Sequence, residues 1–197
     1  PFIFFRDTVN AANPNKHAGM IYASNLCHEI AQNVGFTNLV EEIINEDGTI
    51  TTKTNTGDMV TCNLNSISLG RITDEELEEN IALQIRMLDN VISINQAPVP
   101  ESRMTSDKYR AIGLGTSGYH HYLVNHNIQW ESDEHIEAAD KLFENIAYYA
   151  IKASMELAKE KGAYPAFKGS EWETGEYFTR RGYTSDRWKQ LAADVAK

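Results

Sequence analysis

The residues best suited to chemistry lie near the start of the chain, where an amide, a thiol and a carboxylate occupy alternate positions. They are Asn25, Cys27 and Glu29. Alternate side chains of an extended segment share a face, so all three groups can face one bound molecule if this segment is extended. An amide can orient that molecule, a thiol can react with it and a carboxylate can move a proton. On a helix Cys27 would point away from the other two, so the chemistry predicts an extended segment.

Cys62 is the second of only two cysteines among 197 residues. By spacing alone, Cys27 and Cys62 are either a redox pair or two unrelated core residues, and a lone cysteine is more often a small buried hydrophobic residue. Two cysteines give no disulfide framework, so a reducing cytoplasm is the expected location. His28 adjoins Cys27, but neighbours in an extended chain face opposite sides. This argues against His28 as the base for Cys27.

Two other patterns suggest sites. Residues 113–118 match G-x-G-x-x-G, with Asp133 about 20 residues on, as in dinucleotide-binding turns. Asp133 opens a long helix, however, instead of ending a second strand, so a tight strand-to-helix turn of small residues is the better interpretation. His120 and His121 diverge by about 100° on a helix, and no further Cys or His stands a turn away. We expect solvated or core histidines there, and no metal site.

Composition narrows the classes of partner. A net charge of −10 argues against a nucleic-acid surface, which needs clustered Lys and Arg. An anionic small molecule stays compatible, because backbone N–H groups at helix N-termini can hold phosphate. No apolar stretch is long enough for a membrane span. The length suits one domain with a real core.

Helices are expected where apolar residues recur at steps of three and four. Thr73 and Glu76 form a capping box before a helix. Its apolar face is Leu77, Ile81, Ile85, Leu88 and Ile92. Ser132 begins a long helix that Gly162 ends. Its expected apolar face is Ile136, Ala139, Phe143, Ile146, Ala150, Ala153 and Leu157. Shorter helices are expected over residues 6–12, 117–124 and 185–195.

Strands are expected over residues 20–24, on both sides of a turn at 45–48, over 59–69 with Cys62, and over 110–114. Pro98 and Pro100 indicate a connection, and the Gly- and aromatic-rich stretch 163–183 indicates packed accessory structure. Strands mixed with long helices predict an α/β architecture. The chain starts at Pro1 and stops at Lys197 within a helical pattern. We therefore expect residues 1–197 to be a single partial domain, a segment of a larger or split polypeptide.

The same residues carry a resemblance to the large (α) subunit of ribonucleotide reductases. That family's active-site finger loop reads S-N-L-C-x-E-I, and this chain has Ser24-Asn25-Leu26-Cys27-His28-Glu29-Ile30. Its second redox-cysteine strand, C-N-L-x-S-x-x-L, is similar to residues 62–69, and its R-x-I-G-x-G segment is similar to residues 110–115. Residues 148–172 also follow the family in order. The resemblance covers nearly the whole chain and is in the style of the class I enzymes.

The resemblance implies a fold and a set of roles. The fold would be part of a ten-stranded α/β barrel with the finger loop in its centre. Cys27 would carry the thiyl radical that removes the 3′ hydrogen of a ribonucleotide, and Glu29 would act as base toward the 3′ hydroxyl. Asn25, with Ser24 beside it, would bind the substrate. Cys62 would be half of the dithiol that supplies two electrons, and its partner would be a cysteine that this chain does not contain.

The resemblance also implies partners. The substrate would be a ribonucleoside diphosphate, the radical would come from a metal-containing small subunit, and thioredoxin or glutaredoxin would be the reductant, with no cofactor bound to this chain directly. The remaining segments of the large subunit would complete the barrel. A partial barrel exposes strand edges and apolar surface, so we expect an oligomer.

Two interpretations stay open at this point. In one, the chain is the catalytic-core segment of a ribonucleoside-diphosphate reductase that is inactive alone. In the other, it is a non-catalytic structural or degenerate fragment whose role is assembly with partner chains.

Overall fold

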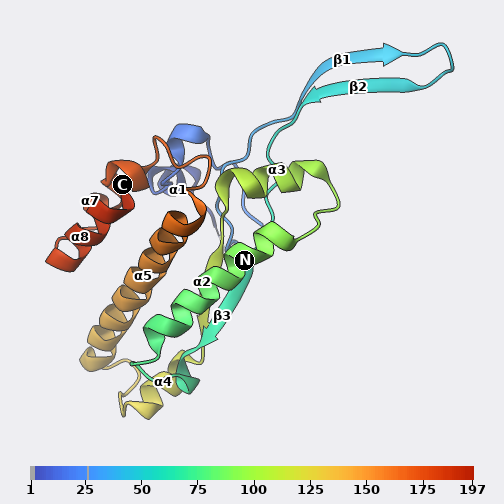
Figure 1. Cartoon of the computed structure of the whole chain (residues 1–197). Coiled ribbons are helices and arrows are strands. Elements are labelled where there is room, and N and C mark those ends of the chain that lie inside the picture. Colours follow the sequence, from blue (N-terminus) through green and yellow to red (C-terminus); the bar gives the residue numbers. More distant parts are fainter. Residues whose placement is uncertain (1–2, 26) are drawn as a thin grey trace.

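Helix α2 (Leu77–Ile94) packs against both a second long helix, α5 (Asp133–Lys161), and a pair of parallel strands (Figure 1). The strands are β3 (Leu64–Ser68) and β4 (Gly113–Ser117), aligned from Leu64 opposite Gly113 to Ser68 opposite Ser117. Parallel strands need a crossover connection, which α2 and the following helix provide. This computed structural model describes residues 3–25 and 27–197.

The other elements are short. They are α1 (Arg6–Ala11), η1 (Lys16–Ala18), β1 (Asn38–Ile44), β2 (Ile50–Asn55), η2 (Leu69–Arg71), α3 (Pro100–Tyr109), α4 (Tyr119–Asn125), α6 (Glu171–Thr174), α7 (Glu176–Arg180) and α8 (Asp186–Val195). The described strands form two separate pairs, β1–β2 and β3–β4, and neither pair closes into a barrel. The expected α/β class is confirmed, whereas the ten-stranded barrel is not seen within these residues.

The apolar face expected on α2 is confirmed. Its five members are all buried, with Ile81 fully so. Leu77, Ile81 and Ile85 share one core cluster with Ile67 and Leu69 of the β3–η2 segment and with residues of α4 and α5, including Leu142 and Ile146. At the start of the helix the Glu76 carboxylate accepts a hydrogen bond from the Thr73 N–H at 3.0 Å, which is one half of the expected capping box. Periodicity thus identified the main core helix correctly.

Helix α5 also begins and ends as expected, but part of its predicted face is wrong. The Ser132 hydroxyl accepts from the His135 N–H at 3.1 Å, and Gly162 follows the last turn with φ +92°. Ile136 is 67% exposed and Phe143 is 43% exposed. Leu142 takes the core position in that part of the helix, and Phe143 packs against the ring of Tyr119 at 5.8 Å instead.

Three expected strands are absent or shorter than predicted. Residues 20–24 form no strand, because the Asn10 side chain hydrogen-bonds both backbone groups of Ile21. The strand expected from Met59 begins only at Leu64. The backbone N–H of Met59 donates to the Thr105 side chain and not to a neighbouring strand. The strand expected at 110–114 begins at Gly113, because Arg110 ends α3 in the left-handed region with φ +44°.

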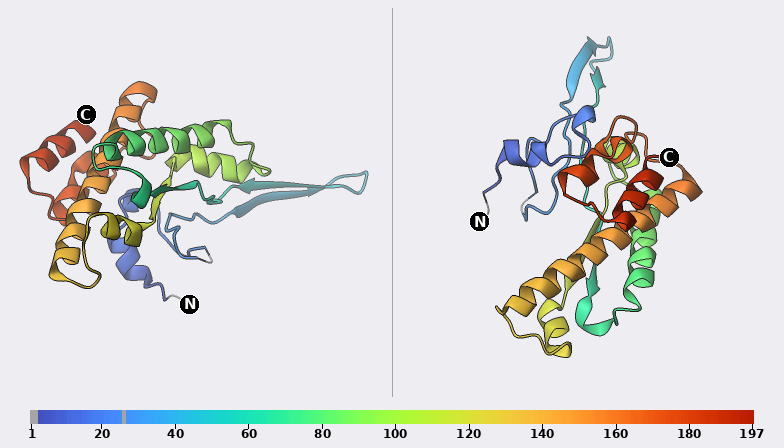
Figure 2. Two further views of the ribbon diagram at one scale, coloured as in Figure 1. Left: turned by 90° about the horizontal axis from the view of Figure 1, so that it is seen from below. Right: turned by 90° about the vertical axis from the view of Figure 1, so that its left-hand side faces the viewer.

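Helix α3 occupies the stretch expected to be a plain connection. Pro100 is its first residue, a position where the missing N–H of proline does no harm. Strands β1 and β2 are confirmed on the two sides of the expected turn, as an antiparallel hairpin whose residues are almost all exposed. The hairpin projects away from the rest of the chain in every view (Figures 1 and 2).

The base of the hairpin is clamped. The Asp58 N–H donates to the Gly35 carbonyl at 3.0 Å, and the Gly35 N–H donates to the Asp58 carboxylate at 2.8 Å. Lys108 of α3 adds an ion pair to the same carboxylate at 3.3 Å. A side chain at Gly57 would collide with the Gly35 carbonyl, with a Cβ only 2.2 Å from it. The projecting hairpin therefore begins after Gly35 and ends before Asp58, and these two residues are in contact.

The C-terminal stretch is packed accessory structure, as expected, and it contains the short helices α6 and α7. Its core consists of Phe178, Trp188 and Leu191. The rings of Tyr183 and Trp188 stack at 3.9 Å, and Trp188 donates to the Glu144 carboxylate of α5 at 2.8 Å. This packing attaches α8 to the long helix.

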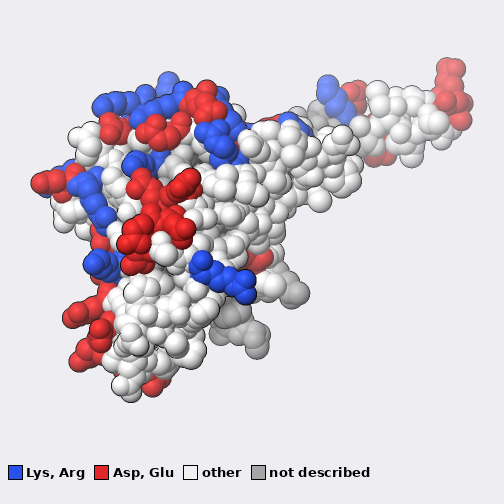
Figure 3. All heavy atoms as spheres, turned by 60° about the horizontal axis from the view of Figure 1, so that its bottom comes forward, with Lys and Arg blue, Asp and Glu red and all other residues white. Residues whose placement is uncertain are grey.

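Ion pairs join α2 to α5. The Asp89 carboxylate accepts from Arg110 at 2.6 and 2.8 Å and from Lys161 at 2.6 Å, and Arg86 pairs with Glu160. In Figure 3 basic and acidic side chains are interspersed over the face that is shown. Burial tends to raise the pKa of Asp89, but the hydrogen bonds from Lys161 and Arg110 outweigh it and leave this pKa below its ordinary value.

Replacing Asp89 should therefore destabilise the chain in a pH-dependent way. We expect Asp89→Asn to lower the free energy of unfolding by about 2–3 kcal/mol at pH 7, as for lost charged hydrogen bonds. A lowered carboxyl pKa stabilises the fold above the unfolded-state value of about 3.9 and is lost as pH falls through the folded value. The difference between parent and variant, measured by urea unfolding, should thus shrink below about pH 4.

Asp107→Asn is the matched control. Asp107 pairs with Arg103 one turn away on α3, and each of these side chains is 44–46% exposed. Its loss should change the unfolding free energy by less than about 0.5 kcal/mol. An equal effect of the two substitutions would contradict the special role of Asp89.

Candidate functional site

Residues 20–25 and 27–34 lie in a loop, with Asn25, Cys27 and Glu29 at its tip. We call the stretch 20–34 the finger segment. Its base is closed by a hydrogen bond from the Val34 N–H to the Met20 carbonyl at 3.0 Å. On the N-terminal side Ile21 is buried, and on the C-terminal side Asn33 is buried. The tip is exposed or half-buried. The finger segment thus has a fixed base and an accessible tip.

The tip is a turn, so the expected extended conformation is wrong. The His28 N–H donates to the Asn25 carbonyl at 3.1 Å, and His28 lies in the left-handed region with φ +64°. Leu26, part of the same motif, lies outside the described residues. The His28 ring packs edge-on against Phe4 with centroids 5.7 Å apart. The alternation of residue types therefore does not by itself place three side chains on one face.

Side chains hold the two sides of the tip together. The Asn25 amide oxygen accepts from the Ile30 N–H at 3.1 Å and from the Ser24 hydroxyl at 3.3 Å. The Ser24 hydroxyl also lies against the Ile30 carbonyl. Within the described residues, the Asn25 amide nitrogen donates no hydrogen bond. Its two N–H groups therefore have no acceptor among the residues that the structure describes.

A small hollow of about 220 Å³ lies between the finger segment and residues 60–62, which precede β3. Its lining residues are Ala23, Ser24, Asn25, Ile30, Gln32, Val34, Val60 and Cys62. Three of the five site residues expected from the sequence therefore meet here: Ser24, Asn25 and Cys62. Cys27 and Glu29 are not in the lining, and both are exposed.

The Cys62 thiol lies within electrostatic reach of the finger tip. The Cys62 side chain is exposed, but the loss of part of its hydration raises its pKa, and the nearby Glu29 and Cys27 raise it further. Cys62 stands two residues before β3, where its neighbours are fixed. Thr61 shares a hydroxyl hydrogen bond with Ser106 of α3 at 2.9 Å, and the Asn63 carbonyl accepts from the Gly113 N–H at 2.9 Å.

The remaining patterns have structural explanations. Gly113 and Gly115 lie in β4, and Gly118 turns the chain into α4 with φ +69°, so the strand-to-helix turn is confirmed. The His120 ring meets Trp130 edge-on at 5.9 Å. The His121 ring lies directly over Gly70, where an added Cβ would come within 2.4 Å of it.

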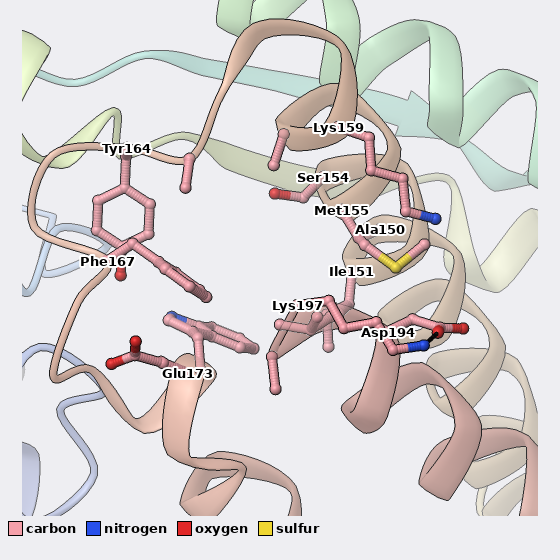
Figure 4. A pocket seen from close by; sticks show the side chains of 15 residues that line it. Ala150, Ile151, Ser154, Met155, Lys159, Tyr164, Phe167, Glu173, Asp194 and Lys197 are labelled. Atoms are coloured by element: carbon pink, nitrogen blue, oxygen red, sulfur yellow. Dashed lines mark hydrogen bonds and ion pairs between the residues drawn. The ribbon is translucent and has the colours of Figure 1, made fainter.

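A larger hollow of about 620 Å³ lies elsewhere, between α5, the loop after it and the end of α8 (Figure 4). Tyr164 and Phe167 face it from the loop, and Met155 faces it from α5. At its rim, Lys197 pairs with Asp194 at 2.9 Å. None of the five expected site residues lines this hollow. It is therefore separate from the candidate site.

The whole chain, residues 1–197, matches the family model described as "Ribonucleotide reductase, barrel domain". The chain belongs to the ribonucleotide reductase barrel-domain family. Among curated relatives, it is 52% identical to the ribonucleoside-diphosphate reductase subunit alpha of Treponema pallidum, over 100% of this chain and 24% of the relative. It is 39% identical to the protein of the same name from Helicobacter pylori, over 89% of this chain and 27% of the relative.

This ribonucleotide reductase barrel segment spans about a quarter of the length of these relatives. A third relative, from Synechocystis, shows 35% identity over 99% of this chain and 24% of its own length. The family expected from the sequence is thus confirmed. Among the residues that the structure describes, no helix has the length and apolar character to cross a bilayer.

One group of residues that supports the candidate site was not predicted from the sequence of this reductase barrel segment. Asn10, Asn13 and Asn33 hold the base of the finger segment through their side-chain amides. The only signal was the presence of asparagines within and directly after a short helix. Such residues are usually caps or turn formers, so their partners were not predictable.

The electrostatic link between Glu29 and Cys62 is testable in a Cys27→Ser background, where Cys62 is the only thiol. Removing the charge with Glu29→Gln should lower the pKa of Cys62 toward its ordinary value. More thiolate is then present at a given pH, and alkylation by iodoacetamide becomes faster. The midpoint of the alkylation rate against pH should move downward.

Glu41→Gln in the exposed hairpin is the matched control and should leave the midpoint unchanged. An unchanged midpoint in Glu29→Gln would show that Glu29 does not act on this thiol.

Proposed function

We propose that this chain is the catalytic-core segment of a ribonucleoside-diphosphate reductase, which reduces ribonucleotides to deoxyribonucleotides by a thiyl-radical mechanism. One observation carries the proposal: Ser24 and Asn25 at the finger tip share a hollow with Cys62, whose pKa responds to the charges of Glu29 and Cys27. Family membership and the names of the relatives support the choice of reaction.

The roles of the chain's own residues follow from their chemistry. Cys27, as a thiyl radical, takes the 3′ hydrogen atom of the ribose and becomes a thiol. Glu29 accepts the proton of the 3′ hydroxyl, and the 2′ hydroxyl leaves as water with a proton from a thiol. Cys62 and a second cysteine supply two electrons and become a disulfide: one of their hydrogens leaves in the water, and the other forms the new C2′–H bond. Glu29 returns its proton to the 3′ oxygen, and Cys27 returns the hydrogen atom to C3′ and is a radical again.

The site residues suit these steps. The free amide N–H groups of Asn25 can donate to substrate oxygens, and Ser24 holds the Asn25 amide in place. A raised pKa keeps Cys62 protonated at neutral pH, as a thiol must be to donate a proton. The exposed Cys27 is accessible to a substrate at the tip. Fixed placement of a reacting thiol is a large part of the rate enhancement in such reactions.

The second cysteine of the dithiol, the radical and the reductant come from partners of this chain. The chain has two cysteines, so the dithiol partner of Cys62 comes from another segment of the large subunit. The radical comes from a metal-containing small subunit, and thioredoxin or glutaredoxin reduces the disulfide. We also propose that residues 1–197 are part of a ten-stranded barrel to which β3 and β4 contribute a parallel pair. Unpaired strand edges favour assembly into an oligomer, and the thiol chemistry fits a reducing cytoplasm.

The central test is Cys27→Ala in a large subunit that carries this segment, combined with its small subunit and a ribonucleoside diphosphate. Deoxyribonucleotide formation should fall to background, because alanine can carry no radical. Glu29→Gln should lower kcat by about two orders of magnitude or more, as for the loss of a general base. Thr52→Ala in the exposed hairpin should retain the parent rate.

Activity of Cys27→Ala at the parent level would disprove the radical assignment and favour a purely structural role for the segment. The chain alone, mixed with the small subunit, should give no turnover, because Cys62 has no dithiol partner. Turnover by the chain alone would refute that part of the proposal.

A further inference from the structure

Both sides of the finger segment are attached to one short stretch, residues 10–16, which we call the anchor segment. On the N-terminal side, the Asn10 amide nitrogen donates to the Ile21 carbonyl at 2.8 Å, and the Ile21 N–H donates to the Asn10 amide oxygen at 2.8 Å. One side chain thus satisfies both backbone groups of Ile21, as a neighbouring strand would.

On the C-terminal side, three asparagines form a closed set of hydrogen bonds. The Asn13 amide nitrogen donates to the Asn33 amide oxygen at 2.7 Å, and the Asn33 amide nitrogen donates to the Asn15 carbonyl at 2.8 Å. The Asn15 N–H donates to the Asn13 amide oxygen at 2.9 Å. Asn13 is 5% exposed and Asn33 is 3% exposed, so an unmade bond here has no water to replace it.

The anchor segment is itself fixed to the C-terminal helices. The buried carboxylate of Glu171 pairs with Lys16 at 2.7 Å and with Arg180, and Arg180 also donates to the Ala12 carbonyl at 3.1 Å. The Tyr164 hydroxyl donates to the Asn15 side chain at 2.6 Å. Asparagine amides therefore connect the base of the finger segment to the anchor segment, and ion pairs and the Tyr164 hydroxyl connect the anchor segment to the C-terminal part of the chain.

We propose that Asn10 and Asn13 are positioning residues, which set the place of the finger tip by fixing its two sides. The inference rests on the proposed function for its consequence in catalysis. Neither residue lines the hollow beside Cys62, so neither touches a substrate there. They act through Ile21 and Asn33, and thereby on Asn25, Cys27 and Glu29.

The substitutions Asn13→Asp and Asn10→Asp test this with almost no change of shape. A carboxylate still accepts from the Asn15 or Ile21 N–H, but it cannot donate to the Asn33 amide oxygen or the Ile21 carbonyl. The first readout is hydrogen–deuterium exchange of peptides from residues 20–34, which needs no catalysis. We expect exchange there to speed up by about tenfold, as for the loss of one hydrogen bond.

The second readout is kcat for deoxyribonucleotide formation in the large subunit with its small subunit, normalised to folded protein. We expect a decrease of about tenfold or more, because small misplacements of reacting groups have large effects on rate. Asn80→Asp is the matched control: Asn80 is an amide on the first turn of α2 that donates to the Glu76 carbonyl, far along the chain from the finger segment. It should change neither readout.

A pH profile separates positioning from general destabilisation. The buried carboxyl of Asn13→Asp becomes a donor again when it is protonated, and burial favours that form. Relative to the parent at each pH, kcat of Asn13→Asp should recover from pH 8 toward pH 6. Asn13→Ala, which has no donor at any pH, should show no recovery.

The outcomes are distinguishable. Parent-like exchange and parent-like kcat in both aspartate variants would overturn the inference, even if Cys27→Ala is inactive. Faster exchange in residues 20–34 with an active Cys27→Ala would support the anchoring but refute the proposed function. If Asn13→Asp does not fold, Asn10→Asp provides the same measurements, since Asn10 is only half-buried.

Discussion

The described residues of the finger segment pair with no strand, and their backbone polar groups must nevertheless be satisfied. At the base, the Asn10 side chain bonds both backbone groups of Ile21, and the Asn13 side chain fixes the side chain of Asn33. At the tip, Asn25 and Ser24 bond across to Ile30. The shape of the candidate site therefore depends on hydrogen bonds from specific side chains, and less on regular secondary structure.

The packed elements α2, α5, β3 and β4, which we call the frame, support these hydrogen bonds. The apolar contact between α2 and α5 is reinforced by the cluster of Asp89, Arg110 and Lys161, and α2 also packs against the parallel pair β3–β4. β3 follows directly from Cys62, and α3 holds Thr61 beside it. One side of the hollow is thus part of the frame. The other side is attached to it through the anchor segment and the buried Glu171.

The frame was largely predictable from the sequence, and the finger segment was not. The apolar period of α2, the Ser132 cap and the hairpin turn are local signals, and each was confirmed. Helix α3 lies where Pro98 and Pro100 indicate a connection, because proline is also well suited to a first helical position. Arg110 and His28 both have positive φ, and each contacts a residue distant in sequence: Arg110 bonds Asp89, and the His28 ring packs on Phe4. A local pattern does not reveal such contacts. The roles of Cys27, Glu29 and Asn25 come from the family pattern, and they stay predictions.

The hairpin β1–β2 separates the finger segment from Cys62 along the chain but not in space. Gly35 and Asp58 are hydrogen-bonded to each other, so the hairpin between them starts and ends at the same place. We therefore expect the position of the finger segment relative to Cys62 to tolerate insertions and deletions in the hairpin beyond this clamp. The finger segment and Cys62 are brought together by folding and not by closeness in sequence. The number of residues between them can therefore vary.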